Sequence, residues 1–153
     1  MTLREGIERV LAEYLGAKTQ SFTQHPIACL IRQDIRNAVA KLSGDEERLI
    51  FKGSAGQSDW VEGPWVGLYN PLITDTAQCG YYICYLFRED MQGVYLSLNQ
   101  GAEEVKQQYK SGANAALLAR AQNYSGMLGL KNGGVSGIKI DLAPASKRYR
   151  TAS

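Results

Sequence analysis

Aromatic side chains are concentrated in the middle of the chain, and they are the residues best suited to bind a flat ligand. Nine of the 14 aromatic residues lie between Phe51 and Tyr95. Tyr81 and Tyr82 are adjacent, so in a strand they point to opposite faces and both faces carry a ring. Several rings are expected to form a sheet core, because aromatics favour strands. The other face is a candidate pocket, since a flat ring with a polar tip stacks on a nucleobase and hydrogen-bonds at its edge.

Residues that usually bind metals or act as nucleophiles do not form a recognisable site. The chain has one histidine, His25, and its cysteines form no C-x-x-C pair and no zinc-ligand spacing. His25 precedes a proline at an expected helix start, which favours a structural role. Cys84 has apolar neighbours and is expected to be a small core residue. We therefore expect no catalytic residue, no metal and no cofactor.

A segment rich in small residues, Gly53 to Ser58 (GSAGQS), is the one candidate for a ligand-binding loop. It matches neither the Walker A pattern nor G-x-G-x-x-G, so it does not indicate a nucleotide phosphate site. A flexible loop between two strands is the simplest interpretation. Small residues also allow the backbone of a ligand to approach closely.

Hydrophobic spacing predicts the helices that frame these residues. An amphipathic helix is expected over 2–16, where Thr2 and Glu5 form a capping-box pattern. A second helix is expected over 26–42, with Pro26 in its first turn. A third is expected over about 102–122, followed by a glycine-rich loop over 125–137.

Short strands are expected between the second and third helices and once near the end of the chain, over 48–52, 65–69, 80–88, 94–98 and 137–142. In the clearest of them, 80–88, one face carries Tyr82, Cys84 and Leu86. The residues 89–93 form a hairpin connection to the next strand. This order predicts one α+β domain with a mostly antiparallel, twisted sheet flanked by helices.

Charge is nearly balanced over the whole chain but not along it. Of 153 residues, 17 are basic and 15 acidic, a net charge of +2. Residues 45–104 carry three basic and ten acidic side chains, and residues 105–153 carry eight basic and one acidic. Such asymmetry hints at a charged partner. With no apolar stretch of membrane-spanning length, no signal peptide and an odd number of cysteines, we expect a cytoplasmic protein that makes no membrane contact.

Several spaced motifs between Gly53 and Gly101 resemble one known family. They are G-x-A-G-Q, a P-W dipeptide, I-T-x-x-A-Q-x-G-Y-Y, Y-L-F-x-x-D and V-Y-L-S-L-N-Q-G, in that order. This combination resembles the core signature of the McrB N-terminal domain family, the DNA-recognition domain of modification-dependent, McrBC-type restriction systems. A looser match extends through the N-terminal helices and to the IDL near the end.

The resemblance implies a binding domain rather than an enzyme. The family's best-known member binds duplex DNA that contains modified (methylated) cytosine and flips the modified base into an aromatic pocket. In full-length proteins the domain is joined to an AAA+ GTPase motor or another effector domain, and a separate nuclease subunit acts with it. We expect residues 1–146 to form this recognition domain and 147–153 to be a basic C-terminal segment, the truncated end of the same domain.

The resemblance also implies site residues. Trp65 of the P-W dipeptide, together with Tyr82 and Leu86, matches pocket positions, and Tyr149 aligns with a fourth. Gln57 aligns with the residue that fills the space left by the flipped base, where the best-known member has an aromatic. The remaining members of this wedge loop are Ser54, Ala55, Gly56 and Ser58. The expected phosphate contacts are Lys52, Arg88, Lys147, Arg148 and Arg150.

Two other functions remain open from the sequence. A domain of this family could sense the duplex without flipping a base, which the glutamine at position 57 favours. Alternatively, the chain could be a protein-interaction domain that tethers an effector.

Overall fold

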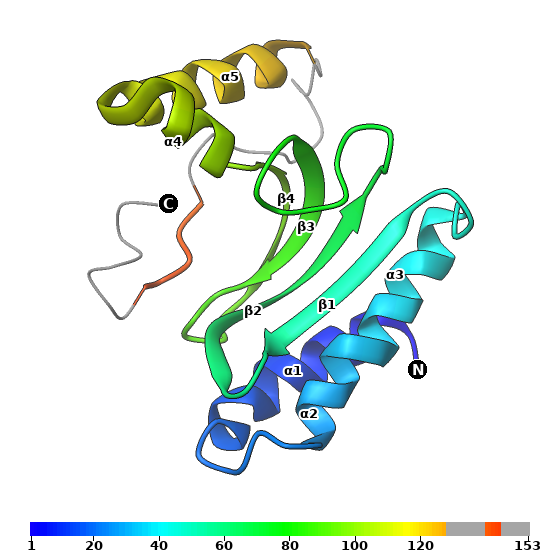
Figure 1. Ribbon diagram of the computed structural model, residues 1–153. Helices are drawn as coiled ribbons and strands as arrows, with labels where there is room; N and C mark the ends of the chain where they lie inside the picture. Colours follow the sequence, from blue (N-terminus) through cyan, green and yellow to red (C-terminus); the bar gives the residue numbers. More distant parts are fainter. Residues whose placement is uncertain (128–139, 145–153) are drawn as a thin grey trace.

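The computed structural model describes residues 1–127 and 140–144, and its centre is a single four-stranded sheet (Figure 1). The strands are β1 (Ile50–Gly56), β2 (Trp60–Tyr69), β3 (Tyr81–Phe87) and β4 (Val94–Gln100). They lie in sequence order and every neighbouring pair is antiparallel. The expected α+β domain with an antiparallel sheet is confirmed, including the hairpin between β3 and β4.

The two N-terminal helices begin where their capping residues predicted. Helix α1 (Leu3–Ala17) starts at a capping box, in which Thr2 accepts from the backbone N–H of Glu5 and the Glu5 carboxylate accepts from that of Thr2. The expected second helix consists of three successive pieces, α2 (Pro26–Cys29), a π-helical segment η1 (Leu30–Ile35) and α3 (Arg36–Ser43). His25 caps this helix, because its Nδ1 accepts from the backbone N–H of Ile27 at 3.2 Å. The structural role expected for His25 is therefore confirmed.

Helices α1 to α3 cover one face of the sheet, and the main core lies between them. Tyr14, Ile31, Val66 and Phe87 are fully buried in this cluster. The π-helical segment approaches β1 so closely that a Cβ added at Gly53 would lie 2.3 Å from the carbonyl oxygen of Ile31. Gly53 is thus the residue that lets the helix layer and the sheet come together.

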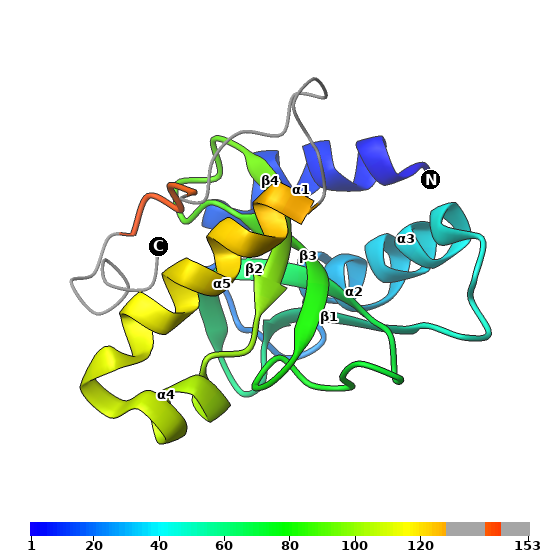
Figure 2. The ribbon, with the colours of Figure 1, turned by 90° about the horizontal axis from the view of Figure 1, so that it is seen from above.

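The C-terminal helix is broken, where a continuous helix was expected. It consists of α4 (Glu103–Tyr109), a 3-10 turn η2 (Lys110–Gly112) and α5 (Ala113–Met127). The break occurs at Lys110, whose φ is +46°, next to Ser111 and Gly112, which are poor helix formers. Residues 125–127, expected in a loop, are helical. Helices α4 and α5 lie away from α3 in both views of the molecule (Figures 1 and 2).

The strand expected over 137–142 is absent from its described part, residues 140–142, while 137–139 lie outside the described residues. This segment instead runs beside the β3–β4 hairpin, where the backbone N–H of Glu89 donates to the carbonyl of Leu142 at 2.9 Å. Within the described residues no helix is long and apolar enough to cross a membrane.

Candidate nucleic-acid interface

The expected pocket residues Trp65, Tyr82 and Leu86 share the sheet face that lies opposite the core. Trp65 is the direct cross-strand partner of Leu86, and Tyr82 lies four residues before Leu86 on β3. Because side chains alternate along a strand, all three point to the same side, whereas Val66 and Phe87 point into the core. All three are partly exposed. We call this side the pocket face; the binding role of its residues stays a prediction.

Two further residues hold Tyr82 in place, and sequence reasoning missed both. The rings of Tyr69 and Tyr82 are stacked, with centroids 5.0 Å apart and planes inclined by 22°. The Asn99 side chain hydrogen-bonds to the Tyr82 hydroxyl. Burial raises the pKa of the Tyr82 hydroxyl above its ordinary value of 10, so it is protonated at neutral pH. Tyr69 could have been found from its spacing, since it lies four residues after Trp65 and so shares its face.

Cys84 lies between Tyr82 and Leu86 on the pocket face and is only 2% exposed. Burial raises the pKa of its thiol to about 12, so the sulfur is not a thiolate nucleophile at neutral pH. This confirms Cys84 as a small buried residue. Among the residues that the structure describes, no three His, Cys, Asp or Glu side chains gather into a possible metal site.

The wedge loop is shorter than expected. Ser54, Ala55 and Gly56 belong to β1, since Ser54 pairs with Trp65 and Gly56 with Trp60, so the connection to β2 contains only residues 57–59. Ala55 is fully buried, which excludes it from a ligand contact. Gln57 and Ser58 are exposed at the tip.

Contacts with residues outside the wedge loop hold the two ends of the loop in place. Gly56 has a φ of +123°, and a Cβ there would lie 1.8 Å from the carbonyl oxygen of Asp59, so only glycine fits this reversal. Arg32 donates from Nη2 to the Gly56 carbonyl at 2.6 Å and lies over the ring of Phe22. The hydroxyl of Tyr14 donates to the Val61 carbonyl at 2.7 Å. Gln57 is therefore presented on a braced turn rather than on a loose loop.

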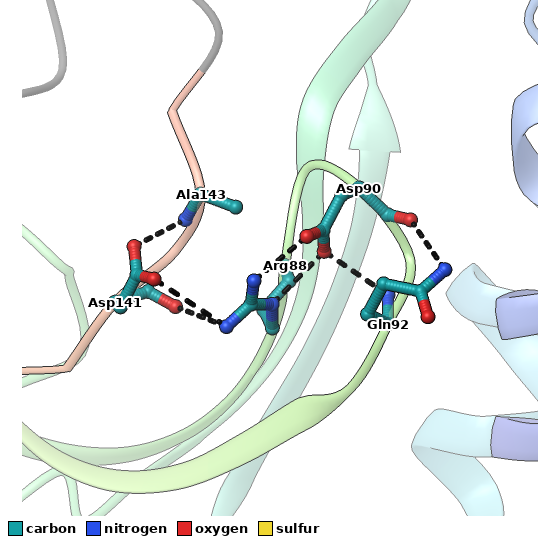
Figure 3. A network of polar contacts seen from close by, with 5 residues as sticks. All are labelled: Arg88, Asp90, Gln92, Asp141 and Ala143. Atoms are coloured by element: carbon teal, nitrogen blue, oxygen red, sulfur yellow. Dashed lines mark hydrogen bonds and ion pairs between the residues drawn. The ribbon is translucent and has the colours of Figure 1, made fainter.

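The two described residues expected to contact phosphates differ in their surroundings. Lys52 is exposed on the pocket face, where its Nζ lies 5.2 Å from the ring centre of Tyr69 and donates to the Asp75 carbonyl. Arg88 forms two hydrogen bonds with the Asp90 carboxylate, at 2.9 and 2.7 Å, and an ion pair with Asp141 at 3.5 Å (Figure 3). A phosphate would have to compete with two carboxylates for Arg88, but only with a backbone carbonyl for Lys52.

The Arg88–Asp90 pair predicts a specific acid dependence of stability. Hydrogen bonds from Arg88 lower the pKa of the Asp90 carboxyl from its ordinary value of 3.8 to about 2. The folded state therefore gains stability from this carboxylate above about pH 4 and loses it as the pH falls toward 2. We expect Asp90→Asn to lower the melting temperature at neutral pH, and the difference from the wild type to shrink toward pH 2. A difference that stays constant across that range would contradict the pairing.

The remaining expected site residues, Lys147, Arg148, Tyr149 and Arg150, lie outside the described residues. The segment 140–144 that precedes them is anchored beside Arg88, at the end of β3 that follows Leu86.

Comparison with known proteins adds one match. A family model described as "MrcB-like, N-terminal domain" matches residues 9–153. No curated protein and no solved structure matches the chain.

Proposed function

Because the chain belongs to the MrcB-like N-terminal domain family, we propose that it recognises modified cytosine in duplex DNA by flipping the base into an aromatic pocket. Family membership makes the chain a DNA-binding module of McrBC-type systems rather than a catalytic domain. The motor or other effector domain, and the nuclease subunit that acts with it, are the partners that we propose for this module. We also propose a cytoplasmic site of action, where such a system meets DNA.

The observation that carries this proposal is the pocket face. Trp65 and Leu86 are adjacent across two strands, and Tyr82 is fixed on the same side by stacking and a hydrogen bond. A wall of two rings and an aliphatic side chain suits one nucleobase, which stacks on the rings and shields its faces from water. Partial exposure leaves these side chains accessible to a ligand, in contrast to the buried core on the opposite face.

The energetics are consistent with a base-flipping reader. Extruding a base costs on the order of a few kcal/mol, which stacking and edge hydrogen bonds in the pocket recover. A single methyl group adds a small apolar contact, so discrimination from that contact is roughly 1–3 kcal/mol. Phosphate contacts supply the affinity that does not depend on modification, and they make it salt-dependent.

Lys52 is the described residue that we propose for such a phosphate contact, because it is exposed beside the pocket residues. The described segment 140–144 is anchored beside Arg88 through Asp141. Tyr149 and its basic neighbours Lys147, Arg148 and Arg150 lie outside the described residues, and we propose them as contacts from the family resemblance alone.

The test is a binding titration of the chain with two matched duplexes that differ only in one 5-methylcytosine, repeated at several salt concentrations. We expect tighter binding to the methylated duplex, and weaker binding to both as salt increases. Equal affinities would contradict recognition of this modification. Failure to bind either duplex would favour a protein-interaction domain.

Gln57 provides a separate test of base flipping. We propose that its amide occupies the gap left by the flipped base and hydrogen-bonds to the orphaned partner base. Gln57→Ala is expected to weaken binding to the methylated duplex by several-fold and to leave stability unchanged, because the side chain is exposed at the loop tip. Fluorescence of 2-aminopurine placed next to the methylated cytosine would report whether that cytosine leaves the stack.

Ser58→Ala is the matched control, since Ser58 is the exposed neighbour of Gln57 in the same turn. An unchanged affinity of Gln57→Ala, together with a base that stays stacked, would favour a reader that senses the duplex without flipping. The glutamine at this position is the observation that keeps this second function open, since an amide stacks less well than an aromatic ring.

A further inference from the structure

We propose that Tyr69 is a positioning residue for the pocket: its buried ring fixes the plane of Tyr82, and Gly67 and Lys52 in turn fix Tyr69. This inference rests on the proposed function and adds a residue to it. Tyr69 is not itself expected to touch the base, because it is only 1% exposed.

The contact between the two tyrosines determines how Tyr82 is presented. Their ring centroids are 5.0 Å apart and their planes deviate by 22°, so one side of the Tyr82 ring is occupied by Tyr69. The hydroxyl of Tyr82 is held by Asn99. One ring side and the polar tip are thus engaged within the protein, and the proposal assigns the other side of the partly exposed Tyr82 ring to the flipped base.

Gly67 provides the space in which Tyr69 lies. A Cβ at Gly67 would be 2.7 Å from the Tyr69 hydroxyl oxygen and 2.8 Å from its Cε2 atom. The ring therefore lies directly on the β2 backbone, at the position that faces Cys84 on β3. Any larger residue at 67 would lift the ring and, through the stack, tilt Tyr82.

Lys52 covers the same ring from β1. Its Nζ lies 5.2 Å from the Tyr69 ring centre, and it donates to the carbonyl of Asp75 in the loop between β2 and β3. Lys52 is also the cross-strand partner of Gly67, so the lysine, the glycine and the tyrosine ring form one packed unit. This unit connects the proposed phosphate contact directly to the proposed base pocket.

The inference predicts a loss of selectivity that a purely structural role would not produce. We expect Tyr69→Leu to reduce the ratio of affinities for methylated and unmethylated duplexes toward one; because Lys52 packs on the Tyr69 ring, the ratio is the readout rather than either affinity alone. Tyr69→Phe keeps the ring and is expected to preserve the ratio. Val66→Ala removes buried side-chain volume from the opposite face of the same strand, so it is the control for lost stability alone and should also preserve the ratio.

The experiment is a titration of the wild type and these variants with both duplexes, alongside their melting temperatures. If the wild type prefers the methylated duplex and Tyr69→Leu keeps this preference, the inference is overturned and the proposed function stands. A wild type without any preference would overturn both. If Tyr69→Leu does not fold, Gly67→Ala takes its place: a lost preference supports the inference, and a retained one overturns it.

Discussion

Trp65→Ala is expected to abolish the preference for methylated DNA and to leave the domain folded. Trp65 is partly exposed on the pocket face, so its removal opens no cavity in the main core. Stacking of a base on an aromatic side chain contributes about 1–3 kcal/mol, which corresponds to a roughly five- to 150-fold loss of affinity for the methylated duplex. Binding to the unmethylated duplex should change little, because phosphate contacts supply it.

Paired titrations with the methylated and unmethylated duplexes, together with circular dichroism, measure this effect. Tyr82→Ala is expected to behave in the same way, since it removes the second ring of the pocket. If both variants unfold instead, the two rings are core residues and the proposed pocket is wrong. If both fold and keep the preference, the base binds elsewhere.

The strands that sequence could predict are those whose residues are apolar and alternating. The pattern around Tyr82 and Leu86 identified β3 and its two faces, because side-chain direction in a strand depends only on residue parity. The last residues of β1 could not be predicted, since Gly53, Ser54 and Gly56 favour loops by composition. These residues are extended because they pair with β2, and this pairing is a tertiary contact that overrides the local preference for a loop.

The grouping of the candidate pocket residues on one face could be predicted in part, because side-chain direction alternates along a strand. The spacing of Tyr82 and Leu86 places them on one face, but the position of Trp65 opposite Leu86 depends on the register between β2 and β3. The roles of Arg32 and Asn99 depend on partners that are distant in sequence. Arg32 donates to the carbonyl of Gly56, which is 24 residues away, and no local pattern reveals this contact.

Charge along the sequence was also an incomplete guide to the surface. The segment 45–104 is acidic overall, yet it contains both Lys52 and Arg88. Asp90 and Asp141 neutralise Arg88, whereas Lys52 lies exposed beside the pocket. The net charge of the segment could not reveal that Arg88 is paired with carboxylates whereas Lys52 contacts a backbone carbonyl and a ring.

Trp60→Ala is expected to have the opposite effect from Trp65→Ala: a large loss of stability with selectivity retained. The ring of Trp60 meets three others edge to face, with centroids 5.3 Å from Tyr14, 5.1 Å from Phe22 and 5.0 Å from His25. Its Nε1 donates to the carbonyl of Gln20 at 3.0 Å, which joins β2 to the turn between α1 and α2. Truncating such a residue costs about 3–5 kcal/mol in the free energy of unfolding, and Trp60→Phe should cost less because a ring remains.

Denaturant unfolding of the two tryptophan variants, combined with titrations at a temperature where both are folded, separates the two roles. Trp60 contacts the helix layer, so its loss should leave the pocket face and the ratio of affinities for methylated and unmethylated duplexes intact. A stable Trp60→Ala variant that had lost this preference would mean that Trp60, rather than Trp65, binds the base. Two tryptophans only five positions apart would then have exchanged roles, and the base would be bound at the helix side of the sheet instead of on the face that carries Tyr82 and Leu86.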